Sequence, residues 1–308
     1  MAGISVFRSD DARVAYLQLY DAVLATSEIP VTEADVETSF GRTHVLRAGD
    51  PSKPPLVALH GSSISSTMWV PNLPVLTANH SVTMIDAIDE VGKSIQAKPT
   101  SKITDLVAWL DETLCALEIQ RSAVVAASRG TWMATHYATA FPERVERLAL
   151  VCPVGIVSGM SPRFLIRGLT AIAVWPTERR VWSLLDSLVR PGNRGLLRQN
   201  PWRPIYQQFV GGTKHFKMSL GNAEPRPWPL TSDCDLRRVA AAQIPVLAII
   251  GREESAQNGP KTAIRFRREL PEARIELVND AGHGILQDQP EIVDGLLAEF
   301  LQEPAGVP

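Results

Sequence analysis

The stretch AASRG, at residues 126–130, decides the fold of this chain because of the segments on either side of it. Residues 121–125 form a short run typical of a buried strand, and residues 131–138 have the composition of a packed helix. A serine among small residues at such a strand-to-helix turn is typical of a nucleophile elbow, which is too tight for bulky neighbours. We therefore expect Ser128 Oγ to project from the carboxyl edge of a sheet, with the next N–H directed at a reacting oxygen.

The elbow departs from the usual G-x-S-x-G pattern, because Ala126 stands in place of the first glycine. Thr131, at the first turn of the following helix, either crowds the elbow or caps the helix, and the sequence leaves both interpretations open. A lone serine at a turn is weak evidence, so its value depends on the rest of the chain.

Composition limits the number of domains and the kinds of partner that this chain can have. Its 308 residues, 45% of them hydrophobic, suit one large domain or one domain with an insertion. A net charge of −2 gives no argument for nucleic acid or an anionic membrane as partner. The six histidines are scattered, so we expect no metal, and nothing indicates an organic cofactor.

Three features predict a cytoplasmic protein. The cysteines number three and lie far apart, which fits a reducing compartment. The start of the chain lacks the basic and apolar regions of a secretory signal. Apolar stretches stay well short of the ~18 residues of a membrane span. We expect a monomer or homodimer.

Short apolar segments alternate with amphipathic ones along most of the chain. We expect strands at 55–59, 81–86, 122–126, 145–151, 244–251 and 273–278, a hairpin near 34–40 and 43–48, and helices at 11–25, 103–118, 131–141, 260–269 and 290–301. Strands that are apolar on both faces and alternate with helices predict a parallel sheet covered on both sides.

The alternation stops between residues 153 and 238. This stretch is rich in proline, arginine and tryptophan, and its helical runs are at 162–175 and 178–190. We interpret residues 153–238 as a helical insertion over one core domain, which residues 1–152 and 239–308 form.

A serine nucleophile needs a base, and the base needs an orienting carboxylate. In a doubly wound sheet these partners should follow strand ends. Glu253 and Glu254 come directly after the strand that ends at Gly251, and His283 lies in a glycine-flanked loop past the next strand. One of the two glutamates should therefore face His283.

An oxyanion hole is predicted where His60, Gly61 and Ser62 follow the strand at 55–59. The backbone N–H groups of Ser62 and Arg129 would hold the oxygen of a tetrahedral intermediate. We interpret His60 as a structural residue under this loop.

Over roughly residues 35–302 the chain resembles α/β-hydrolases of the cap-bearing carboxylesterase type. The resemblance rests on AASRG, the strand end at Asp86 and four further stretches: LHGSSISSTMW (59–69), FPERVERLALV (141–151), PVLAIIGREE (245–254) and NDAGHGILQDQPEIV (279–293). It implies a mostly parallel eight-stranded sheet flanked by helices, with 153–238 as a cap. It also implies Ser128 as nucleophile, His283 as base and Glu254 as acid, where the family often has Asp.

The function expected from the resemblance is hydrolysis of a carboxylic ester, lactone or thioester of a small molecule through an acyl-enzyme. The same triad can instead transfer the acyl group, or cleave amides or C–C bonds. A non-catalytic protein that binds a small ligand under the cap is a further alternative. Trp69 and Trp175 are candidates for substrate contact, although both also suit a packing role.

Arg129 is the unusual residue of the elbow. Its guanidinium could pair with a carboxylate of the substrate or with a buried acid of the protein. We favour the buried acid.

Overall fold

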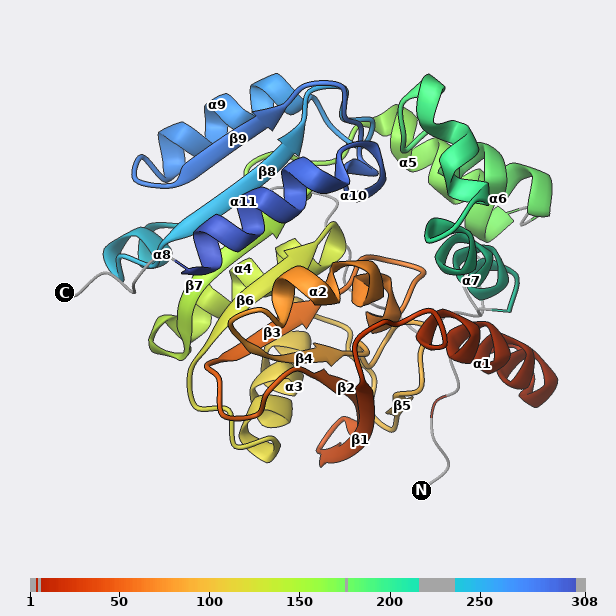
Figure 1. The fold of residues 1–308 in the computed structure, drawn as a ribbon, viewed down its shortest axis with the longest axis horizontal. Coiled ribbons are helices and arrows are strands. Elements are labelled where there is room, and N and C mark those ends of the chain that lie inside the picture. Colours follow the sequence, from red (N-terminus) through yellow and green to blue (C-terminus); the bar gives the residue numbers. More distant parts are fainter. Residues whose placement is uncertain (1–3, 5–6, 175–176, 216–235, 303–308) are drawn as a thin grey trace.

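The computed structural model describes residues 4, 7–174, 177–215 and 236–302, and within them the chain forms one mixed sheet (Figure 1). Its strands are β1 (Val31–Thr38), β2 (Gly41–Ala48), β3 (Pro55–Leu59), β4 (Ser81–Ile85), β5 (Ile95–Gln96), β6 (Ser122–Ala127), β7 (Val145–Val151), β8 (Val246–Gly251) and β9 (Arg274–Val278). The strand order is β1-β2-β4-β3-β6-β7-β8-β9, and β5 pairs with β2.

The sheet is parallel from β4 to β9, and the hairpin of β1 and β2 adds an antiparallel edge. The predicted mostly parallel sheet is confirmed, and eight strands lie along its path. The expected number of eight strands is one too low, because Ile95–Gln96 forms a ninth strand beside β2. Two residues are too few to leave a pattern in the sequence.

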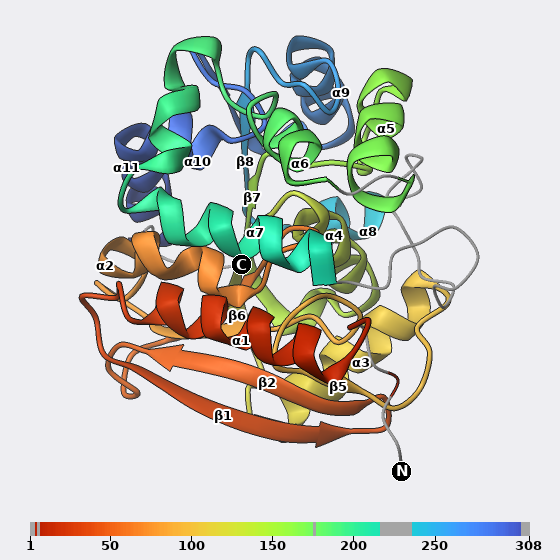
Figure 2. The ribbon, with the colours of Figure 1, turned by 90° about the vertical axis from the view of Figure 1, so that its right-hand side faces the viewer.

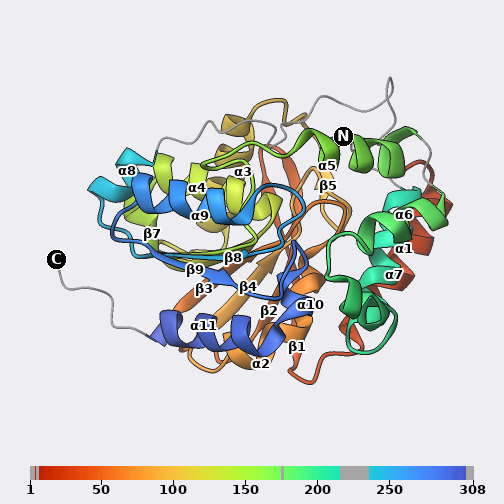
Figure 3. The same ribbon diagram turned by 90° about the horizontal axis from the view of Figure 1, so that it is seen from above.

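Helices cover both faces of the sheet, as the view along its edge shows (Figure 3). On one side lie α3 (Ile103–Ala116), α4 (Arg129–Ala140), α8 (Arg237–Ala241) and α9 (Gly259–Glu269), and on the other side lie α2 (Leu73–Leu76) and α11 (Pro290–Gln302). Shorter helical turns are η1 (Ser66–Asn72), η2 (Pro142–Arg144) and α10 (Ile285–Asp288).

The central strand β6 shows why a chain of this composition folds into three layers. Ala123 and Val125 pack into the core under α2 and α11, whereas Val124 and Ala126 pack into the core under α3 and α4. Each face therefore receives every second residue, as the period of a strand requires. Because all six residues of β6 are buried, the strand is stable only between two layers of helices.

Between β7 and β8 the chain leaves the sheet and forms a separate group of helices, the insertion. They are α5 (Pro162–Gly168), η3 (Leu169–Val174), α6 (Glu178–Leu185), η4 (Pro191–Arg198) and α7 (Trp202–His215). Residues 216–235 of the predicted insertion lie outside the described residues. The helix predicted over 178–190 ends at Leu185, because Leu188 turns toward the loop that carries His283 and its carbonyl accepts the N–H of Gly284.

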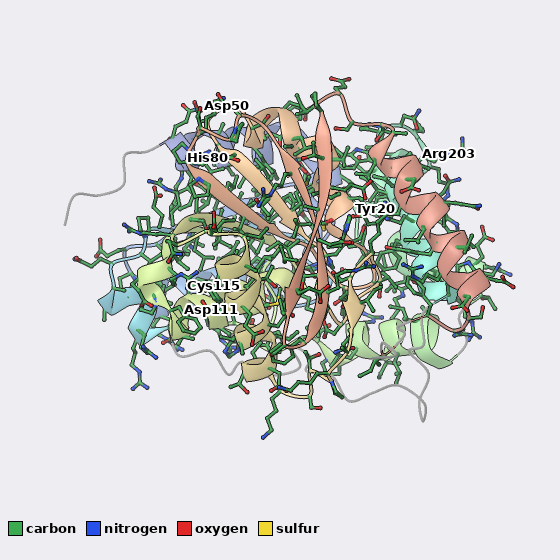
Figure 4. All side chains as sticks on the ribbon, turned by 90° about the horizontal axis from the view of Figure 1, so that it is seen from below. Tyr20, Asp50, His80, Asp111, Cys115 and Arg203 are labelled. Carbon is green, nitrogen blue, oxygen red and sulfur yellow. The ribbon has the colours of Figure 1, made fainter. Side chains whose placement is uncertain are left out.

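The first helix, α1 (Asp10–Leu24), packs along α7 of the insertion (Figure 2). Gly212 of α7 permits this close approach, since a Cβ there would lie 3.1 Å from the ring of Tyr16. Tyr20 of α1, labelled in Figure 4, has its ring centre 6.1 Å from that of His44 on β2. The N-terminal helix therefore links the insertion to the edge of the sheet.

Gly130, the last residue of AASRG and the second residue of α4, lies close to the end of β3. A Cβ at this position would lie 2.7 Å from the carbonyl oxygens of both Leu59 and His60. Real Cβ atoms do not approach backbone oxygen so closely, so this arrangement of α4 requires glycine here.

We expect Gly130→Ala to lower the free energy of unfolding by about 1–3 kcal/mol, because the added methyl group overpacks a rigid backbone contact. Urea denaturation measures the change. Gly168→Ala is the matched control, because the same methyl group on α5 would meet nothing within 4 Å. If both variants were equally stable, the steric account of the elbow would be wrong.

Candidate active site

Ser128 occupies the turn between β6 and α4 in a conformation that few residues adopt. Its φ is 50° and its ψ −121°, a region that is unfavourable for residues other than glycine. The Ser128 N–H donates to the carbonyl of Val151 on β7 at 3.0 Å. The hydroxyl of Thr131 donates to the Ser128 carbonyl at 2.6 Å. Thr131 therefore ties the first turn of α4 to the elbow.

A continuous chain of hydrogen bonds begins at this serine. Ser128 Oγ lies 2.9 Å from His283 Nε2, and His283 Nδ1 lies 2.9 and 3.0 Å from the two carboxylate oxygens of Glu254. An ionised carboxylate only accepts hydrogen bonds, so the proton of the neutral imidazole belongs on Nδ1. Nε2 is then left to accept the hydroxyl proton of Ser128.

The structure places Glu254, rather than Glu253, against the imidazole. The Glu254 side chain is fully buried and also accepts the N–H of Ala256 at 2.7 Å. Glu253 is exposed, and its carboxylate accepts the N–H of Ala281 at 3.0 Å. The two neighbours at the end of β8 therefore have separate roles, and only Glu254 can orient His283.

Residues of the insertion hold the loop that carries His283. The N–H of Gly284 donates to the carbonyl of Leu188 at 2.8 Å. The carboxylate of Asp288 accepts the N–H of Gly282 at 2.8 Å and that of Arg190 at 3.1 Å. Sequence reasoning missed Asp288, because its partner Arg190 lies 98 residues away and no local pattern marks the pair.

The loop after β3 passes close to Ser128. A Cβ at Gly61 would lie 3.3 Å from Ser128 Cβ, so the glycine lets the loop backbone approach the serine closely. Ser62 follows at once, and the next residue, Ser63, has a positive φ of 61°. The Ser63 N–H donates to Glu90 Oε2 at 3.0 Å, which fixes the course of the loop past Ser128.

His60 supports this loop from below, as a structural residue would. It is buried, its Nδ1 lies 2.7 Å from the Gly61 carbonyl, and its Nε2 accepts the N–H of Ala87 at 2.9 Å. Both ring nitrogens are thereby engaged with the backbone.

The side chain of Arg129 points into the protein. It is 3% exposed and forms a two-pronged ion pair with Asp89, at 2.7 and 3.3 Å, and it lies 3.7 Å from Glu90. The pairing favours the interpretation that Arg129 serves a buried acid. Because Glu90 also accepts the N–H of Ser63, one cluster of charges contacts both the elbow and the loop above it.

Trp69, one of the two candidates for substrate contact, lies inside the hydrophobic core. Its side chain has no exposed surface and packs in the core beneath η1, so it anchors the loop after β3. The sequence leaves substrate contact and loop anchoring both open, because the two roles differ only in the direction in which η1 points the indole of Trp69. Trp175, the other candidate, lies outside the described residues.

The described residues contain neither a cluster of metal ligands nor a membrane-spanning helix. Between residues 7 and 302, leaving aside the two undescribed gaps, no three His, Cys, Asp or Glu side chains gather as metal ligands. No helix in the same part of the chain is long and apolar enough to span a bilayer.

Comparison with known proteins gives a consistent result. Residues 56–294 match the model of the alpha/beta hydrolase family. The carboxylesterase nap of Bacillus subtilis is 27% identical, with 98% of this chain and 97% of that protein covered, and the carboxylesterase YbfK of the same organism is 25% identical over 96% of each. The crystal structure of naproxen esterase from Bacillus subtilis superposes with a TM-score of 0.84 at 25% identity, covering 96% of this chain and 99% of that one.

We expect Arg129→Met to lower the free energy of unfolding by about 3–5 kcal/mol, because it leaves the Asp89 carboxylate buried without its cation. The double variant Arg129→Met/Asp89→Leu should recover much of this loss, since it removes both charges. Urea denaturation of the four corners of the cycle gives the coupling between the two residues.

Arg42→Met is the matched control for this cycle. Arg42 pairs with Asp35 at 3.5 Å, and both side chains are 40% exposed, so its loss should cost no more than about 1 kcal/mol. An Arg129→Met variant as stable as Arg42→Met would contradict the buried-pair assignment.

Proposed function

Because this chain belongs to the alpha/beta hydrolase family, we propose that it is a carboxylesterase that forms an acyl-enzyme on Ser128. The observation that carries the proposal is the unbroken hydrogen-bonded chain from Ser128 through His283 to Glu254. The carboxyl ends of β6, β8 and β9 bring these three residues together. Two proteins that are similar to this chain are named carboxylesterases, which supports ester hydrolysis over the other reactions that such a triad performs.

Acylation would begin at the serine hydroxyl. Ser128 Oγ attacks the ester carbonyl while its proton passes to His283 Nε2, and the carbonyl oxygen becomes negatively charged. His283 then donates that proton to the alkoxide, so that the C–O bond breaks and the alcohol leaves. Glu254 stabilises the imidazolium that exists between these two transfers, because its carboxylate lies 2.9 Å from Nδ1.

Deacylation would repeat the sequence with water. His283 Nε2 takes a proton from water, the hydroxide attacks the acyl carbon, and the proton returns to Ser128 Oγ as the carboxylic acid departs. Deacylation thereby restores the serine hydroxyl and the neutral imidazole. Over the whole cycle, one water is consumed, its hydroxyl group leaves in the acid, and its proton replaces the serine proton that left with the alcohol.

The developing oxyanion would be held by the backbone N–H groups of Ser62 and Arg129. The contact of Gly61 with Ser128 supports this assignment, because it places the loop beside the reacting atom. The charge cluster supports it as well, since Arg129 pairs with Asp89 and Glu90 accepts the N–H of Ser63. Loss of one such donor costs about 2.7–4 kcal/mol of transition-state stabilisation.

We also propose that residues 1–152 and 239–308 form the catalytic core and that the insertion, 153–238, is its cap. Phe164 of α5 supports a role above the site, because its ring centre lies 6.0 Å from that of His283. Cys115 is an exposed free thiol, which supports a reducing compartment such as the cytoplasm.

Replacement of the nucleophile gives the first test of this function. Ser128→Ala should lower kcat for a p-nitrophenyl ester by about 10⁶-fold and abolish labelling by a fluorophosphonate. Circular dichroism should show an unchanged fold, because the variant removes one hydroxyl group. Retained hydrolysis together with retained labelling would refute the assignment of Ser128.

The acid of the triad is tested by two isosteric variants. Glu254→Gln should lower kcat by about 10⁴-fold, because the amide no longer fixes the tautomer of His283 or stabilises its charged form. Glu253→Gln, one residue away and exposed, should keep nearly full activity. Equal losses in the two variants, measured with the same ester, would contradict the separate roles of the two glutamates.

A further inference from the structure

The insertion carries a charge opposite to that of the whole chain. Residues 160–203 hold eight arginines against two acidic residues, Glu178 and Asp186, although the net charge of the protein is −2. The proposed ester hydrolysis makes no use of these arginines. A local excess of guanidinium groups costs electrostatic free energy, unless something negatively charged lies among them.

Four of these arginines converge on one cavity of about 430 Å³. Arg167 reaches it from α5, Arg179 from α6, and Arg194 and Arg198 from η4. In the described part of the chain, Asp186 is the one acidic residue in the cavity wall. Three separate elements therefore direct cationic side chains at a common space, which is large enough for a small organic ligand.

Hydrogen bonds to Asp186 hold Arg194 and Arg198 in the cavity wall. The guanidinium of Arg198 binds both carboxylate oxygens of Asp186, at 2.8 and 3.0 Å, and stacks over the ring of Trp182 at 4.3 Å. Arg194 Nε donates to the carbonyl of Asp186 at 3.0 Å. Among the described residues of the wall, the single carboxylate, that of Asp186, is thus occupied by Arg198.

Arg167 and Arg179 are the other two arginines of the wall, and among the described residues no acidic side chain forms an ion pair with either. Both are exposed, and Ser183, four residues after Arg179 on α6, adds a hydroxyl group to the lining. In the described part of the wall, these two guanidinium groups therefore have no carboxylate as partner.

We propose that this cavity is a binding site for the phosphate group of a phosphomonoester. Arginines that approach from several directions suit a tetrahedral dianion, which offers acceptor oxygens on all sides. A carboxylate is planar and singly charged, so one arginine satisfies it. The volume exceeds that of inorganic phosphate and leaves room for the organic part of the ligand.

The phosphate could belong to a soluble metabolite or to a lipid headgroup, and both share the chemistry of the site. Three large apolar side chains are exposed on the same segments: Ile166 at 63%, Leu169 at 45% and Leu196 at 38%. They would contact the acyl chains of a lipid, whereas a soluble phosphomonoester has no acyl chains to contact them. The site is separate from Ser128 and His283, so its test is independent of the proposed hydrolysis.

The test measures binding of inorganic phosphate to the full chain by isothermal titration calorimetry at constant ionic strength. Saturable binding is expected, and Arg167→Gln/Arg179→Gln should weaken it by about tenfold or more, because charge-assisted hydrogen bonds are lost. Arg163→Gln/Arg203→Gln is the matched control: it removes the same charge from the insertion but outside the cavity wall, with Arg203 at the outer edge of the molecule (Figure 4). It should bind phosphate like the wild type.

Vesicle sedimentation separates the two sources. Binding to phosphatidylcholine vesicles that contain phosphatidic acid, lost in Ile166→Ser/Leu169→Ser while phosphate binding persists, would identify a lipid headgroup. Phosphate binding without vesicle binding would identify a soluble phosphomonoester. Absence of saturable phosphate binding, or equal weakening in both double variants, would overturn the proposal.

Discussion

The close approach of Gly130 to the backbone of Leu59 and His60 is the constraint on which the proposed site depends. It lets the first turn of α4 lie against the end of β3, and at the same turn Ser128 has a positive φ and its hydroxyl lies 2.9 Å from His283. The parallel strands have their carboxyl ends at one edge of the sheet, so the proposed acid and base lie there as well. A steric limit on one Cβ position thus underlies the geometry of the proposed site.

Buried charge is the second constraint on the same region. Arg129 follows Ser128, and its guanidinium is compensated by Asp89 and Glu90, while Glu90 also accepts the N–H of Ser63. Burying three charges costs desolvation energy that the pairing offsets only when the geometry is good. The cluster thereby holds the elbow and the loop beyond β3 in one arrangement, which is what two converging N–H donors require.

The sequence predicted the parts of this structure that depend on local pattern. Apolar runs such as β6 and β8 marked the parallel strands, and the order of Ser128, Glu254 and His283 indicated how they would meet. The pairs formed by Asp89, Glu90 and Asp288 were missed, because each joins segments far apart in the chain and leaves no periodic signal. For Trp69 the sequence leaves substrate contact and packing both open for a related reason: the direction in which a short helix points a side chain depends on tertiary packing. The sequence does not predict β5, because its pairing with β2, and not its own composition, makes it a strand.

A crystal structure of the protein after reaction with a p-nitrophenyl phosphonate tests the central claim most directly. The phosphorus stands for the tetrahedral carbon, and its non-bridging oxygen stands for the oxyanion. We predict a covalent bond from phosphorus to Ser128 Oγ, with that oxygen about 2.7–3.1 Å from the backbone nitrogens of Ser62 and Arg129. A phosphorus bonded to another residue, or an oxygen turned away from both nitrogens, would contradict the account.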